Sequence, residues 1–135
     1  MKSSNPCPCG LGQPYGQCCG RFHTGEAFAG TAEALMRSRY SAFVVLDEAY
    51  LLRTWHSSRR PHRLSLDPDL RWTGLEVIAS TGGGVLEPIG TVEFRASYLP
   101  PDGGSTPQVQ YGYSRFVREE GHWTYLDEVD AVEVH

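Results

Sequence analysis

Residues 91–99 read Thr-Val-Glu-Phe-Arg-Ala-Ser-Tyr-Leu, and the alternation within this segment decides the fold class. In an extended chain successive side chains point to opposite sides, so a period of two predicts a β-strand with one buried face. The apolar face consists of Val92, Phe94, Ala96 and Tyr98, and the polar face consists of Glu93, Arg95 and Ser97. Gly-rich and Pro-rich turn clusters at 82–84 and 100–104 bound the strand on both sides.

More strands follow this segment and helices precede it. Residues 109–118 and 122–129 predict a hairpin around Glu119-Glu120-Gly121. Residues 31–46 predict a helix that Thr31 can cap, and Asp47 can cap a second short helix in which Leu51 and Trp55 are one turn apart. Helices followed by consecutive strands predict an α+β domain, with the helices packed on one face of an antiparallel sheet.

Length and charge suggest two unequal parts within the 135 residues. We expect a small knuckle at 1–25 and an α+β domain at 26–135 that is long enough to bury its own core. The knuckle holds Lys2 and Arg21 and no acid, whereas the remainder has a net charge of −6. The chain has no apolar run of membrane-spanning length and no apolar leader, so we expect a cytoplasmic protein without membrane insertion.

All four cysteines lie in the knuckle, in the pattern Cys7-x-Cys9-x(8)-Cys18-Cys19. Two close pairs separated by a Gly-rich loop suit one tetrahedral Zn²⁺ with no vacant position, which is typical of a structural site. Two disulfides, a redox pair and free structural thiols are the alternatives. The expected compartment and the absence of a C-x-x-C spacing argue against the first two. His23 is an alternative fourth ligand in place of one thiolate.

The segment from Cys7 to Gly20 resembles the SEC-C motif, in which the positions matching the four cysteines are metal ligands. Leu11 and Gln13 stand where the motif commonly has Ser and Lys, and neither position is a ligand. The lost Lys weakens the expectation of a charged partner surface. Four thiolates around one zinc ion would make the knuckle neutral, which is a poor footprint for nucleic acid.

The body of the chain resembles the bacterial YchJ family. The resemblance rests on the string Thr-Ala-Glu-Ala-Leu-Met-Arg-Ser-Arg-Tyr-Ser-Ala-Phe at 31–43, on Thr-Trp-His at 54–56 and on Gly-Thr-Val-Glu-Phe at 90–94. It implies an N-terminal SEC-C knuckle and a cone-shaped domain with the nuclear-transport-factor-like fold, and it implies no activity. Gly112 stands where many relatives are expected to have an acidic residue, which argues against a pocket role there.

Residues 53–63 contain four arginines, two histidines and no acid. The simplest interpretation is neutralisation by the acidic segment 119–135; the alternatives are an anion site and nucleic-acid binding with base stacking on Trp55. His56 is expected to cap a helix end rather than to catalyse. The candidate residues for an anion or pocket site are Trp55, His56, Arg59, Arg60 and Arg95.

We therefore expect a zinc-binding protein whose knuckle contacts an unidentified protein partner. One alternative is a small-molecule-binding protein or an enzyme that uses the cavity of the α+β domain, with His56 and Arg95 as its polar groups. The other is nucleic-acid binding through residues 53–63. Because the sequence shows no nucleophile, base and acid that belong together, an enzyme is the less favoured outcome.

Overall fold

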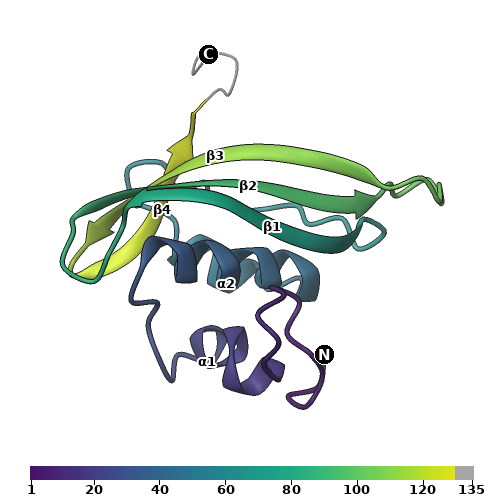
Figure 1. The fold of residues 1–135 in the computed structure, drawn as a ribbon, viewed down its shortest axis with the longest axis horizontal. Helices are drawn as coiled ribbons and strands as arrows, with labels where there is room; N and C mark the ends of the chain where they lie inside the picture. The colour runs from purple at the N-terminus through teal and green to yellow at the C-terminus, as the bar shows by residue number, and fades with distance from the viewer. Residues whose placement is uncertain (130–135) are drawn as a thin grey trace.

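The computed structural model describes residues 1–129 as a curved four-stranded antiparallel sheet with helices beneath one face. Figure 1 shows three layers, in which α2 lies between the sheet above and the N-terminal segment with α1 below. The predicted α+β fold is confirmed. The elements in chain order are η1 (Tyr15–Gln17), α1 (Cys19–His23), α2 (Ala32–Val45), α3 (Glu48–Arg53), β1 (Arg71–Gly82), β2 (Ile89–Leu99), β3 (Gln108–Glu119) and β4 (His122–Glu128).

The sheet is a meander in which every strand pairs with its neighbour in the sequence, in the order β1-β2-β3-β4. The predicted alternation of β2 holds, since Val92, Phe94 and Ala96 are buried on the side of the helices. On the opposite face, Val109 and Tyr111 of β3 are exposed. The register places Phe94 opposite Gly112, and the Phe94 ring lies across the surface that a larger residue at 112 would fill.

Side-chain caps set the beginnings of both longer helices. The Thr31 hydroxyl accepts a hydrogen bond from the Ala34 amide at 3.1 Å and begins α2. The Asp47 carboxylate accepts one from the Tyr50 amide at 3.0 Å and begins α3. Both caps were predicted, because an oxygen-bearing side chain satisfies an otherwise unpaired amide of the first turn.

Trp55 lies outside α3, so the expectation that it extends this helix is wrong. The helix ends at Arg53, and the chain then pairs with β4. The amide of Tyr125 donates to the Thr54 carbonyl and the amide of His56 donates to the Tyr125 carbonyl, both at 2.8 Å. These two bonds pair backbone groups that another helical turn would otherwise have paired. Beside them, the Trp55 ring lies edge-on to the Tyr125 ring.

The core lies between α2 and the sheet. Its buried members are Ala32, Leu35, Met36 and Tyr40 of α2, and Val92, Phe94, Ala96, Phe116 and Trp123 of the strands. A second cluster joins Ala42 to Tyr50 and Leu51, so α3 is fixed to the side of α2. No helix within residues 1–129 has the length and apolar character needed to cross a bilayer.

Candidate metal centre and cavity

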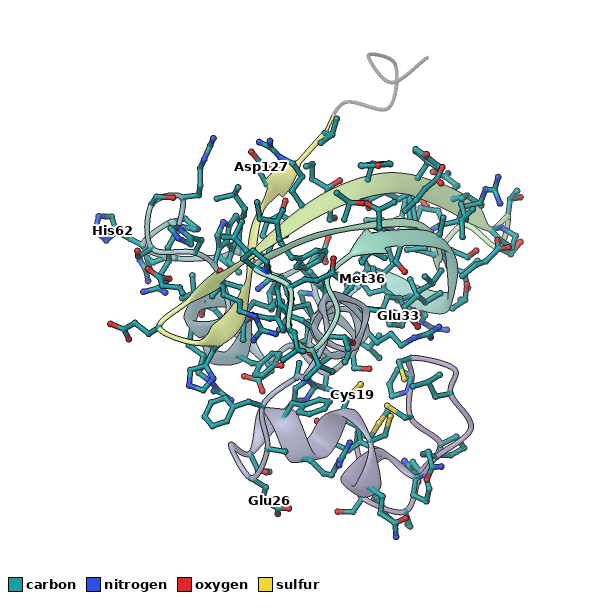
Figure 2. The ribbon with its side chains drawn as sticks, turned by 60° about the vertical axis from the view of Figure 1, so that its left-hand side comes forward. Cys19, Glu26, Glu33, Met36, His62 and Asp127 are labelled. Atoms are coloured by element: carbon teal, nitrogen blue, oxygen red, sulfur yellow. The ribbon has the colours of Figure 1, made fainter. Side chains whose placement is uncertain are left out.

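The four cysteines converge on one buried point beside α2. Their ligand atoms all lie within 4.8 Å of one another, and Figure 2 shows the yellow sulfur atoms gathered near Cys19. All four cysteines are free, and the Sγ atoms of Cys9 and Cys18 are 3.5 Å apart, which is well beyond a disulfide bond. The arrangement therefore satisfies the geometric requirement for a cluster of thiolate ligands.

Short backbone turns bring the two cysteine pairs together. The Cys7 amide donates to the Gln13 carbonyl at 2.9 Å, which closes the loop that follows the first pair. Gly10 has φ +86°, a left-handed conformation that glycine adopts without the steric cost of a Cβ. The second pair is placed by η1 and α1, since the Cys18 amide donates to the Tyr15 carbonyl at 3.0 Å.

The chemistry of the donor set favours a cation. Four thiolates at about 2.3 Å from a tetrahedral zinc ion would be roughly 3.8 Å from one another, close to the spacing found here. Hydrogen bonds from Cys19 and Cys9 lower the pKa of the Cys7 thiol, whereas burial raises the pKa of Cys18 to about 12. Because buried thiolates repel one another, a positive ion is needed to hold four of them together. The four cysteines could thus hold a metal ion.

His23 lies outside this group. Its Nε2 donates to the Ser38 carbonyl of α2 at 2.8 Å, and its Nδ1 accepts from the Tyr15 hydroxyl. Because both ring nitrogens are engaged, the imidazole connects the knuckle to α2. The four-cysteine set is the ligand set that the geometry supports.

The knuckle packs closely on α2 and α3. Arg37 of α2 donates from Nη1 to the Cys9 carbonyl at 2.8 Å, and Arg53 of α3 donates from Nη2 to the carbonyls of Phe22 and His23 at 3.0 and 2.9 Å. Phe22 also packs against the Ala42 cluster. The cysteine cluster is therefore fixed against α2 and α3.

A cavity of about 370 Å³ lies between α2 and the sheet. That volume is within the usual range for small-molecule sites. Aromatic rings form most of its wall: Tyr40, Phe43, Trp55, Trp72, Phe94, Phe116 and Tyr125. Its polar or charged lining residues are Arg39, Gln110, Ser114 and Glu128.

His56 and Arg95, the two polar groups expected in the cavity, do not line it. Arg95 points from the exposed face of β2 and pairs with Glu76 at 3.3 Å. The ring of His56 lies on the surface between Ser58, at 2.8 Å from Nδ1, and Glu119, at 4.0 Å from Nε2. His56 donates its backbone amide to β4. Trp55 alone among the five candidates lies in the cavity wall.

Arg39 is the charged group that sequence reasoning missed. The residue is only 6% exposed, and its guanidinium lies over the rings of Trp55 and Tyr125, 5.3 and 4.7 Å from the ring centroids. Nη1 donates to the Leu51 carbonyl at 2.8 Å and to the Thr54 hydroxyl at 2.7 Å. Burial lowers its pKa to about 10, so the side chain is still charged at neutral pH.

The basic segment 53–63 contacts one acid at the end of β3, Glu119, and one at the end of β4, Asp127. Arg59 pairs with Asp127 at 3.4 Å, the amide of Ser57 donates to Glu119 at 3.1 Å, and Arg60 donates to the Trp55 carbonyl at 2.7 Å. Arg115 holds the pKa of Asp127 below its ordinary value. Within residues 1–129, the neutralisation interpretation accounts for the Arg59 pair, whereas Arg60 has a backbone acceptor. Residues 130–135 of the predicted acidic segment lie outside the described residues.

Comparison with known proteins agrees with this architecture. A family model described as the middle, NTF2-like domain of YchJ matches residues 31–128, and the SEC-C motif matches residues 4–21. A UPF0225 protein of Streptomyces coelicolor is 57% identical over 122 residues, covering 90% of this chain and 93% of the relative. A UPF0225 protein of Corynebacterium glutamicum is 47% identical over 119 residues, covering 88% and 92%.

Two solved structures share the fold. The SEC-C motif containing protein of Rhodopseudomonas palustris has a TM-score of 0.77 at 32% identity, covering 93% of this chain and 100% of that one. The SEC-C motif containing protein of Psychrobacter arcticus has a TM-score of 0.74 at 31% identity, covering 93% and 82%. The resemblances stated from the sequence are confirmed, and the chain belongs to the YchJ family of UPF0225 proteins, with a SEC-C motif at its N-terminus.

Proposed function

We propose that this protein binds a small molecule in the cavity between α2 and the sheet, and that one structural zinc ion holds its knuckle in place. The observation that supports it most is the cavity itself, an aromatic space of about 370 Å³ with a buried arginine in its wall. Apolar walls with a few placed polar groups are typical of ligand sites. The fold alone carries no function, so the argument rests on these residues.

The metal has a structural role in this proposal. Cys7, Cys9, Cys18 and Cys19 would fill all four positions of a Zn²⁺, which leaves none for water or substrate. Thiolate ligands favour zinc among the common divalent ions. We expect elemental analysis of protein purified without added metal to give one zinc ion per chain, and a Cys18→Ser/Cys19→Ser variant to contain none. A metal-free protein with a disulfide-linked 7–19 segment would refute this part.

Contact between the knuckle and a protein partner remains a prediction. The geometry supports a partner contact less than it supports ligand binding in the cavity, because α2 and α3 of the same chain already cover one side of the knuckle. The exposed Leu11 in the loop between the cysteine pairs is the feature that favours a partner contact.

Binding in the cavity can be tested with the neutral fluorophore N-phenyl-1-naphthylamine. Its emission rises in an apolar site, and we expect saturable binding to the zinc-loaded protein. Ala96 is buried in the cavity wall, so Ala96→Leu should fill part of the space and weaken binding at least tenfold. The matched control is Ala79→Leu, at an exposed position of β1. Equal binding by both variants, or no saturable binding by the wild type, would refute the proposal.

A further inference from the structure

Arg39 carries a buried charge without a carboxylate partner among residues 1–129. No carboxylate of that range approaches its guanidinium within 4.0 Å, although the residue is only 6% exposed. Arginine is almost never buried unless it is paired, because removal of its charge from water is costly. The two flanking rings and two neutral acceptors offset part of that cost. Glu128, farther away in the same wall, offsets some more, and an anion bound directly to the guanidinium would add a close partner.

The guanidinium keeps donors available on the side that Nη1 does not use. Both of its hydrogen bonds within residues 1–129 leave from Nη1, and neither Nε nor Nη2 donates to any atom of that range. Nε and Nη2 form the edge of the planar fork that binds a carboxylate through two parallel hydrogen bonds. The bonds through Nη1 hold the guanidinium in one orientation, so the fork does not have to be ordered when a ligand arrives.

Trp55 supplies a second unsatisfied donor next to Arg39. Its indole Nε1 is a buried side-chain atom with no hydrogen-bond partner in the described range 1–129. A buried donor without an acceptor costs roughly 1–3 kcal/mol. The Arg39 guanidinium lies over the same indole ring, and both side chains line the cavity. The cavity wall therefore contains two side chains that each keep at least one donor without an acceptor in the described range.

The size and the aromatic lining of the cavity indicate the apolar part of the ligand. Seven aromatic side chains surround a volume of about 370 Å³, which corresponds to roughly a dozen water-sized groups at about 30 Å³ each. Flat apolar rings pack well against aromatic walls in offset or edge-on arrangements. A bicyclic aromatic ring system bearing one small polar group matches both the size and the lining.

The charge of the cavity selects among anions. Arg39 is its cation, and Glu128, in the same wall, is an anion whose Oε1 accepts from Ser114 at 2.8 Å. Glu128 repels any anion bound at Arg39, and it repels a ligand with one negative charge less than a phosphate monoester with nearly two. A carboxylate also matches the two-point edge of the guanidinium.

We propose that the cavity binds an aromatic monocarboxylate, with the carboxylate on Nε and Nη2 of Arg39 and the ring system against the aromatic walls. This inference rests on the proposed function, since it assumes that the cavity is a ligand site, and it adds the chemical class of the ligand.

The test compares 2-naphthoate with its neutral isostere 2-naphthamide at pH 7 on the zinc-loaded protein. Affinities come from calorimetry, and the site comes from the indole N–H signals in ¹H–¹⁵N spectra. Trp55 and Trp72 line the cavity, whereas the Trp123 indole donates to the Gly30 carbonyl at 3.2 Å and serves as a reference. We expect naphthoate to bind at least tenfold more tightly than naphthamide, with the largest shift at Trp55.

Substitutions separate the charge from the cavity. Arg39→Met should lower naphthoate affinity at least tenfold, to the level of the amide, and leave the amide unchanged. Arg95→Met is the matched control, because Arg95 lies on the exposed face of the sheet. If Arg39→Met does not fold, Arg39→Lys supplies the measurement. It keeps the charge without the planar fork and should weaken naphthoate binding while a preference over the amide persists.

The outcomes distinguish the two proposals. Equal affinity for naphthoate and naphthamide, or a carboxylate preference that survives in Arg39→Met, would overturn the inference and leave the cavity as a neutral binding site. Tighter binding of 2-naphthyl phosphate than of naphthoate would overturn the choice of carboxylate. Failure of both naphthoate and naphthamide to shift Trp55 would overturn the inference and the proposed function together.

Discussion

Replacing Cys18 and Cys19 by serine should weaken the whole molecule and not only the knuckle. Two partly buried hydrogen bonds, Arg37 to the Cys9 carbonyl and His23 to the Ser38 carbonyl, join the knuckle to α2. At about 1 kcal/mol for each, they contribute about 2 kcal/mol to the free energy of unfolding. Packing of the Phe22 ring adds about 1 kcal/mol. The exposed Arg53 bonds are screened by water and add little.

The expected loss of about 3 kcal/mol corresponds to a fall in melting temperature of roughly 10 °C for a chain of this size. Circular dichroism would follow the melting of wild type, wild type with a chelator, and the double variant. The chelator should lower the melting temperature of the wild type by about 10 °C. The double variant should melt at the temperature of the chelated wild type, and the chelator should not change its melting temperature further. Gln13→Ala is the control, since only the backbone carbonyl of this exposed residue closes the metal loop.

The amide signals of residues 91–98 show whether the loss of stability in the double variant is confined to the knuckle or extends to the sheet. The sheet has its own core against α2, so these signals should remain dispersed at 25 °C in the double variant while those of residues 1–25 collapse. An unchanged melting temperature would refute the reasoning that the knuckle supports α2. Collapse of the sheet signals would show that residues 1–25 and 26–135 do not form separable units.

Three further predictions concern the body. Gly112→Ala would place a Cβ 2.3 Å from Cζ of Phe94, and moving that ring should cost about 1–3 kcal/mol in urea unfolding; no change would mean that the ring shifts freely. Arg115 depresses the pKa of Asp127, so this pair stabilises the fold above about pH 4 and ceases to do so as pH falls through the depressed value. The stability difference from Asp127→Asn, at most about 1 kcal/mol, should therefore vanish in acid; a difference that grew in acid would contradict this. Inorganic phosphate at low salt should not bind saturably to residues 53–63, because Arg59 and Arg60 already have acceptors; saturable, salt-sensitive amide shifts there would restore the anion-site interpretation.

Local signals in the sequence predicted most of the fold. Thr31 and Asp47 begin helices where their side chains can cap the first turn, and the alternation at 91–99 marks the buried face of β2. Such features depend on neighbours along the chain. The cysteine pattern was informative for the same reason, since two close pairs on either side of a short loop can converge on one point. The extent of α3 was misjudged because pairing of residue 55 with β4 is a long-range contact.

The cavity residues could not be read from local patterns. Arg39 lies in a polar stretch of a helix, where an arginine is usually exposed to solvent, and only the packing of α3 and β4 around it buries the charge. Conversely, the concentration of arginines at 53–63 suggested an anion site, but the contacts of this segment are with Asp127 of β4, Glu119 of β3 and nearby backbone. Burial depends on the tertiary neighbours, and composition does not encode them.

α2 lies between the cysteine cluster and the cavity, and it contacts both. Arg37 bonds to the knuckle and Arg39 lies in the cavity wall; helical residues two apart do not share a face. The orientation of Arg39 depends on α3, which supplies the Leu51 carbonyl. The last residue of α3, Arg53, is itself held to the knuckle through the carbonyls of Phe22 and His23. A metal ion that orders the knuckle would thus also support α2 and α3, chiefly through Arg37 and the Phe22 ring. Because these helices orient the guanidinium, a structural metal would have a physical reason to be joined to this domain.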